Sequence, residues 1–111
     1  MDSDFLSLVF EGKGLNSKVF SLVRLELLAG VAELGEGESV TYRELKAALE
    51  LNDGVLYANL KALVEMGYLK AEKVMLENKE LEAYRITGEG LEEWVKVREW
   101  LRKFAEGEKN G

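Results

Sequence analysis

The apolar positions of the chain follow a helical period in several stretches and a strand-like period in one region. The first long helical stretch runs from Ser17 to Leu34, where Ser17 can cap the helix and Gly35 can end it. Its apolar residues go nearly all the way round the helix, whereas a surface helix on one small core has a single apolar stripe. A second face of this helix therefore needs a cover.

Two shorter helices come next in the pattern. Thr41-Tyr-Arg-Glu44 has the spacing of a capping box, and Asn52-Asp53 offers N-caps for a further helix that runs through Met66 and ends at Gly67. The inward stripes are Leu45, Ala48 and Leu49 in one helix and Leu56, Leu60, Leu63 and Val64 in the other. Two short helices joined by a tight turn form a helix-turn-helix, which we place at residues 41–67.

The pattern then changes to alternation. Residues 68–77 and 81–87 are strand-like and are linked by Asn78-Lys79-Glu80, which predicts a β-hairpin. Thr87 caps a last helix from about Glu89 to Phe104, with an apolar stripe at heptad spacing. The short apolar segment from Asp4 to Phe10 fits either a helical turn or an edge strand, and the pattern does not choose between them.

These elements predict one domain that is mainly α with a small β-hairpin (α+β), a winged helix-turn-helix with an added C-terminal dimerisation helix. We divide the chain into an N-terminal segment (1–16), the domain (17–104) and a disordered tail (105–111). Within the domain, the wing covers residues 68–87 and the C-terminal helix covers residues 88–104. A length of 111 residues with 47% hydrophobic residues suits one compact core.

Composition removes several classes of function. The acidic start and the absence of an apolar run of about 20 residues exclude a signal peptide and a membrane span, so we expect a cytoplasmic protein with no membrane partner. Without cysteine or histidine, the chain has no disulfides and lacks the usual ligands of structural zinc and haem. It also has no cysteine nucleophile and no histidine base for a serine nucleophile, which removes most catalytic options. We therefore expect no metal, no cofactor and no enzymatic activity.

The segment from Leu51 to Leu69, followed by Tyr84-Arg-Ile-Thr-Gly-Glu-Gly90, resembles the recognition helix and wing of archaeal and bacterial winged-helix transcription regulators related to the MarR and ArsR groups. Val23-Arg-Leu-Glu-Leu-Leu28 is similar to the first helix of the same regulators. The resemblance covers residues 17–104. It implies a homodimer on double-stranded DNA, with the third helix in the major groove and the wing against the backbone or the minor groove.

The resemblance also implies which residues touch DNA. Asn59 is suited to adenine, Tyr57 to a phosphate or a thymine methyl group, and Lys61 to a phosphate. Lys79 is the basic residue at the wing tip. The full set expected to contact DNA is Arg43, Val55, Tyr57, Ala58, Asn59, Lys61, Lys70, Lys73, Lys79 and Arg85.

We expect the first long helix and the last helix to form an isologous dimer interface, because their apolar faces are too large for a monomer surface. The residues expected there are Phe20, Val23, Leu27, Leu91, Trp94, Val97, Leu101 and Phe104. The alternative for the tryptophans is packing on their own core. An unknown small apolar effector at this interface remains compatible with the sequence.

Two features depart from the regulators that the chain resembles. Ala58 and Asn59 stand where those proteins commonly carry Arg or His, and the wing tip from Glu77 to Glu82 is poor in arginine. The net charge is −6, although residues 39–87 hold seven basic and eight acidic residues, a net charge of only −1. Because DNA affinity depends on Lys and Arg at phosphates, the alternative function is a winged-helix module that binds another protein and not DNA.

Overall fold

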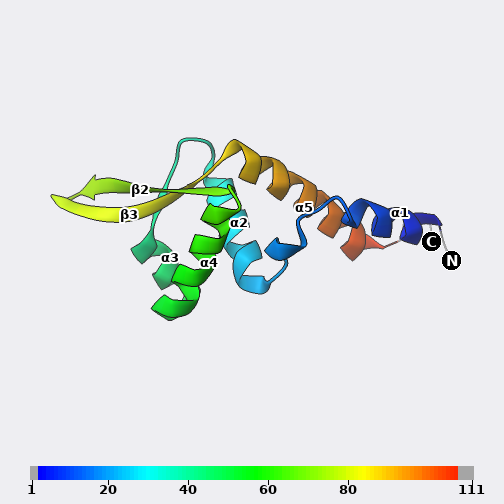
Figure 1. Cartoon of the computed structure of the whole chain (residues 1–111), viewed down its shortest axis with the longest axis horizontal. Helices are drawn as coiled ribbons and strands as arrows, with labels where there is room; N and C mark the ends of the chain where they lie inside the picture. Colours follow the sequence, from blue (N-terminus) through cyan, green and yellow to red (C-terminus); the bar gives the residue numbers. More distant parts are fainter. Residues whose placement is uncertain (1–2, 108–111) are drawn as a thin grey trace.

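The computed structural model describes residues 3–107 and contains five α-helices and three strands among them (Figure 1). In chain order the elements are α1 (Ser3–Gly12), the 3-10 turn η1 (Ser17–Val19), α2 (Leu22–Leu34), β1 (Val40–Thr41), α3 (Tyr42–Leu49), α4 (Asp53–Glu65), β2 (Leu69–Leu76), β3 (Lys79–Ile86) and α5 (Gly88–Glu106). The predicted fold class, mainly helical with a small antiparallel sheet, is confirmed.

The sheet has three antiparallel strands in the order β1-β3-β2. Strand β1 pairs Val40 with Tyr84 and Thr41 with Ala83. The sequence analysis missed this strand because two residues are too few to produce an alternating pattern. Its pairing attaches the start of α3 directly to the hairpin.

The core lies where α2 meets α4, α5 and β3. Its fully buried side chains include Leu27, Leu28 and Val31 of α2, Leu56, Leu60 and Leu63 of α4, and Val97 of α5. Helix α2 therefore passes through the middle of the domain and packs against neighbours on several sides. This arrangement explains why apolar residues surround it.

Both helices of the predicted helix-turn-helix begin at the predicted caps. Thr41 Oγ1 accepts a hydrogen bond from the Glu44 amide at 3.1 Å, and Glu44 Oε1 accepts one from the Thr41 amide at 3.0 Å, which completes the capping box. Asn52 Oδ1 accepts from the Val55 amide at 2.9 Å and caps α4. One of the predicted inward residues differs, because Ala48 is exposed, whereas Leu49 and Val64 are half-buried and pack against the core.

The start of the first long helix and the hairpin turn also differ from the prediction. Ser17 belongs to η1, and the cap of α2 is Ser21, whose hydroxyl accepts from the Arg24 amide at 3.2 Å. The hairpin turns at Glu77 and Asn78, which have φ of 51° and 67°, as a tight two-residue hairpin turn requires. Lys79 and Glu80 therefore lie in β3, opposite Leu76 and Met75.

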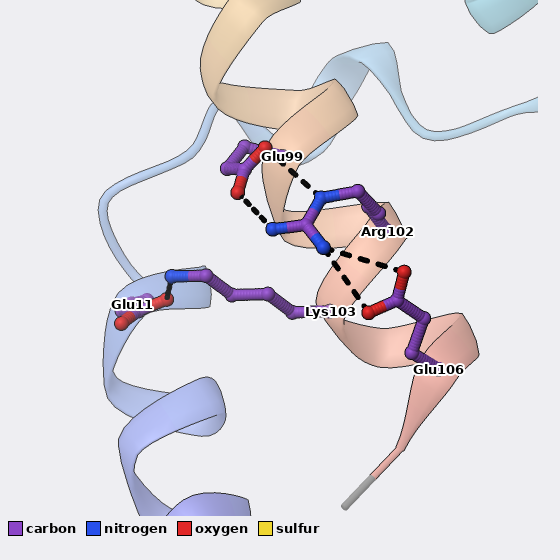
Figure 2. A network of polar contacts seen from close by, with 5 residues as sticks. All are labelled: Glu11, Glu99, Arg102, Lys103 and Glu106. Atoms are coloured by element: carbon purple, nitrogen blue, oxygen red, sulfur yellow. Dashed lines mark hydrogen bonds and ion pairs between the residues drawn. The ribbon is translucent and has the colours of Figure 1, made fainter. Parts of the chain in front are cut away.

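The undecided N-terminal segment is helix α1, which packs against the end of α5. We call α1 together with residues 100–106 of α5 the arm. In the arm, Trp100 Nε1 donates to the Leu8 carbonyl at 2.8 Å, and Lys103 Nζ pairs with Glu11 at 3.2 Å (Figure 2). Figure 1 places the arm and the tip of the hairpin at opposite ends of a molecule that measures 59 × 26 × 23 Å.

The C-terminal helix extends further than predicted, into the segment 105–111 that we expected to be a disordered tail. Ala105 and Glu106 belong to α5, and the Gly107 amide donates to the Lys103 carbonyl at 3.1 Å to close the helix. The rest of the predicted tail, residues 108–111, lies outside the described residues.

Candidate nucleic-acid interface

The outer face of α4 is exposed beside the hairpin. The core takes Leu56, Leu60 and Leu63 from this helix, and these residues lie three or four positions apart on one side. The opposite side exposes Asp53, Gly54, Val55, Tyr57, Ala58 and Lys61. Four of the predicted DNA-contacting residues, Val55, Tyr57, Ala58 and Lys61, are therefore accessible on one helix, and Arg43 is exposed on the neighbouring α3.

The structure engages both ends of the Asn59 side chain, which the sequence analysis assigned to adenine, in hydrogen bonds within the protein. Arg24 Nε donates to Asn59 Oδ1 at 2.8 Å, and Asn59 Nδ2 donates to the Val55 carbonyl at 2.8 Å. A bidentate contact with adenine needs both the oxygen and the nitrogen of the amide. Asn59 therefore connects α4 to α2 through Arg24. Arg24 is itself held in position, because its guanidinium group also donates to the Lys18 carbonyl at 2.8 Å.

The register of the hairpin separates its basic residues. Because side chains alternate between the faces of a strand, Lys70, Lys79 and Arg85 share one face and Lys73 lies on the other. Arg85 is half-buried and pairs with Glu72 at 3.0 Å, so its charge is partly used within the hairpin. The three lysines are exposed and make no ion pair with another described residue. The basic residues predicted to contact DNA from the wing therefore lie on two faces of the hairpin.

A group of polar side chains joins α3 to the start of α4, and the sequence analysis did not single it out. Tyr42 donates to Asp53 Oδ1 at 2.8 Å, and Lys46 Nζ pairs with the same oxygen at 2.9 Å. The contact with Lys46, followed by that with Tyr42, lowers the pKa of Asp53, and the hydrogen bond to Asp53 raises the pKa of Tyr42. Lys46 and Asp53 lie seven positions apart on two different helices. Their spacing predicts an ion pair only when the end of α3 and the start of α4 are already known.

Tyrosines gather where α3, α4 and β3 approach one another. Burial is the main cause that raises the pKa of Tyr84, and its hydrogen bond to Glu82 adds to this effect. Tyr57 and Tyr42 add smaller electrostatic effects that raise the pKa of Tyr84 in the same direction. The acidic Glu82 lies on β3 within the wing and is half-buried, and its carboxylate would repel a phosphate that approached this strand.

The predicted dimer residues fall into three groups. Leu27 and Val97 are fully buried in the core of the protomer, so their assignment to a dimer interface is wrong. Val23, Leu91, Trp94 and Leu101 are half-buried and pack against the same core, as in the alternative considered for the tryptophans. Phe20 and Phe104 remain exposed, and both contact the ring of Trp100.

The largest apolar surface of the arm was missed by the sequence analysis. Phe5, Leu6, Val9 and Phe10 are exposed on α1, with Phe10 exposed to 76%. Their spacing of i, i+1, i+4 and i+5 is a helical stripe, which is the signal that distinguishes a helix from an edge strand in this segment.

An open hollow of about 480 Å³ lies between α1 and α5. Its lining is Glu11, Gly14, Leu15, Val95, Lys96, Glu99, Trp100 and Lys103. Among residues 3–107 there is no cluster of His, Cys, Asp and Glu that could hold a metal ion, and no helix there is long and apolar enough to cross a bilayer.

Comparison with known proteins agrees with this geometry. The family model of the winged helix DNA-binding domain matches residues 23–105. A transcriptional regulator homologue from Pyrococcus horikoshii OT3 is 18% identical, with a TM-score of 0.75 over 96% of this chain and 97% of that one. The repressor BigR from Xylella fastidiosa is 18% identical, with a TM-score of 0.60 over 96% and 97% of the chains.

A PadR family transcriptional regulator from Eggerthella lenta DSM 2243 is 25% identical, with a TM-score of 0.60 over 82% of this chain and 85% of that one. No protein in the curated set matches the sequence. The likeness to P. horikoshii and X. fastidiosa proteins extends over nearly the whole chain, so it includes α1 as well as the helix-turn-helix.

Proposed function

Because the chain belongs to the winged helix DNA-binding domain family, we propose that it is a transcription regulator that binds duplex DNA as a homodimer. Helix α4 of each subunit enters the major groove, and the hairpin lies on the backbone or in the minor groove. The two half-sites are then about 34 Å apart, one turn of B-DNA, or a multiple of that distance. The similar proteins from P. horikoshii, X. fastidiosa and E. lenta are transcriptional regulators by name, which agrees with this role.

The observation that carries the proposal is the exposed face of α4, held by caps at a fixed position beside a projecting hairpin. Lys61 on α4 and Lys70, Lys73 and Lys79 on the hairpin are exposed and have no carboxylate partner among residues 3–107. Much of the acidity of the chain lies elsewhere, because residues 1–38 hold three basic and seven acidic residues. Counterion release at phosphates therefore depends on a small set of lysines, doubled in a dimer.

The homodimer rests on the arm. Phe5, Leu6, Val9 and Phe10 are exposed on α1, and Phe104 is exposed near the end of α5. Figure 1 shows α1 and the end of α5 at the end of the molecule away from the hairpin. Apolar surface of this kind on a soluble domain marks an interaction site. A second copy can cover it isologously. We propose that the hollow beside Trp100 binds a small apolar effector, because the apolar side chains of Leu15, Val95 and Trp100 line it where the arm joins the rest of α5.

The direct test is binding of duplex DNA from the region upstream of the gene, measured by fluorescence anisotropy at increasing salt. We expect tighter binding at low salt, and we expect Lys61→Ala and Lys79→Ala each to weaken binding and to reduce the slope of log K against log salt by about 1. Lys13→Ala is the matched control, because Lys13 is exposed next to the arm and far along the chain from α4. Absence of binding at low salt would overturn the proposal.

One observation favours the alternative of a protein partner. The hairpin tip exposes Met75 and Leu76, at 67% and 54%, beside Glu77, Lys79 and Glu80, whose formal charges sum to −1. An apolar tip with acidic neighbours suits a protein surface better than a phosphate backbone. Recovery of a specific protein that is lost on Leu76→Glu, together with no binding to DNA, would support this function in place of regulation through DNA.

A further inference from the structure

Asp53 occupies the first position of α4, where recognition helices place the residues that contact base edges. Its side chain is 69% exposed. An acidic residue here stabilises the helix dipole, but it also stands at the part of the helix that enters the major groove first. Its orientation and its neighbours decide whether it can read a base.

The contacts of Asp53 orient its carboxylate. The Tyr42 hydroxyl donates to Oδ1 at 2.8 Å, and Lys46 Nζ lies 2.9 Å from the same oxygen. No described residue donates a hydrogen bond to Oδ2. One oxygen therefore fixes the group to α3, and the other is available to accept a hydrogen bond.

Lys46 also reduces the electrostatic repulsion between the Asp53 carboxylate and the phosphates of DNA. An isolated carboxylate would be repelled by the phosphates on either side of the groove. The ammonium group of Lys46 is adjacent to Asp53 and its side chain is 45% exposed, so the pair is neutral and can face a phosphate with its positive end.

The other side chains on the outer face of α4 are less suited to accept a hydrogen bond from a base. Val55 and Ala58 have no hydrogen-bonding side chain, and Lys61 can only donate. The exposed Tyr57 has one hydroxyl that can donate or accept, and we assign this side chain to a phosphate or a thymine methyl group. Both ends of the Asn59 amide are used within the protein. Asp53 can only accept, so it requires an amino group in the major groove.

Two bases offer an amino group there. Adenine N6 lies between two acceptors, its own N7 and O4 of the paired thymine, whose lone pairs oppose a carboxylate, whereas cytosine N4 has an acceptor on one side only, O6 of the paired guanine, and the C5–H group on the other. On the basis of the proposed DNA-binding function, we infer that Asp53 determines specificity: its Oδ2 accepts a hydrogen bond from the N4 amino group of a cytosine in each half-site, with Tyr42 and Lys46 holding it in place.

The test is selection of duplexes from a random-sequence pool by the full chain, followed by affinity measurements on the selected site. We expect a C·G pair at one position of each half-site, and replacing it by T·A should weaken binding by about 5- to 150-fold. Asp53→Ala should bind both sites with equal affinity. Asp53→Asn, which keeps the shape of the side chain, should lose the preference for cytosine and favour adenine.

Lys13→Ala is the control, because Lys13 is exposed and lies outside α3 and α4, and it should leave both the affinity and the preference for cytosine unchanged. Lys46→Ala keeps the carboxylate but removes one of the groups that hold it, so it should weaken binding to both sites and reduce the preference for cytosine less than Asp53→Ala does. Circular dichroism establishes that each variant is folded. If wild type and Asp53→Ala select the same bases, or if wild type has no preference for cytosine, the inference is wrong and the DNA-binding function stands. If wild type selects no DNA at all, the proposed function fails first.

Discussion

Gly90 lies where α5 crosses the end of the hairpin, and its place in the structure admits no side chain. A Cβ at this position would lie 2.1 Å from the Tyr68 carbonyl oxygen and 2.9 Å from Ile86 Cδ1. The Tyr68 carbonyl cannot retreat easily, because it accepts hydrogen bonds from the Thr87 amide at 3.0 Å and the Thr87 hydroxyl at 3.1 Å. One missing methyl group thus sets how closely α5 approaches the sheet.

We predict that Gly90→Ala lowers the free energy of unfolding by about 3 kcal/mol, the upper part of the range for overpacking, because backbone must move. Gly88→Ala is the control, since a Cβ there meets nothing within 4 Å and alanine favours the helix. Urea titrations followed by tryptophan fluorescence measure both variants. Equal stability of the two would contradict the packing described for Gly90.

At the scale of elements, α1 is a helix that its own sequence cannot sustain. It has 10 residues, and isolated helices shorter than about 12 residues are marginal in water. Its order comes from α5, through the hydrogen bond from Trp100 to the Leu8 carbonyl, the close approach of Gly12 to the Trp100 ring and the ion pair of Glu11 with Lys103 (Figure 2). The arm is therefore the element most easily loosened.

We predict that Trp100→Phe increases hydrogen exchange in residues 3–12, because the variant loses the indole donor and a hydrogen bond with a net value of about 1 kcal/mol. Trp94→Phe is a matched control, since Trp94 Nε1 is buried with no hydrogen-bond partner among the described residues. The control should leave exchange in α1 unchanged. The same exchange in both variants would show that the Trp100 hydrogen bond does not hold the arm.

At the scale of the whole molecule, the chain is elongated, with the hairpin of β2 and β3 at one end and the arm at the other (Figure 1). Helix α4 lies on the side of the hairpin, so the surface proposed to contact DNA is separate from the arm. Dimerisation through the arm would therefore leave α4 and the hairpin of both subunits uncovered. Dimerisation through the hairpin tips would cover the surface that has to meet DNA. A substitution in the arm should disrupt the dimer only if the subunits associate through the arm, and a substitution at the hairpin tip only if they associate through the hairpins.

We predict a mass of twice 12.5 kDa for the wild type in sedimentation experiments at micromolar concentration, and a monomer for Phe10→Glu, which buries a charge in the arm interface. Leu76→Glu places the same charge at the hairpin tip and should remain dimeric. A wild-type monomer would exclude the homodimer. Loss of the dimer in Leu76→Glu alone would move the interface to the wing.

The sequence by itself determined the helix-turn-helix, the hairpin and the last helix, including the caps at Thr41, Asn52 and Thr87. These features depend on residues three or four positions apart, so their signals are local. It also indicated that α2 needs cover on more than one side, because an apolar residue must be buried somewhere. It did not determine which element provides that cover.

Only the tertiary structure decided which of the predicted side chains are free to contact DNA or a second subunit. Asn59 is occupied by Arg24, 35 positions away, and Arg85 is occupied by Glu72 across the hairpin. Leu27 and Val97 are enclosed by the protomer, whereas the apolar face of α1 is left open. Hydrogen bonds and burial between distant segments depend on how the elements pack, and periodicity along one segment carries no record of that packing.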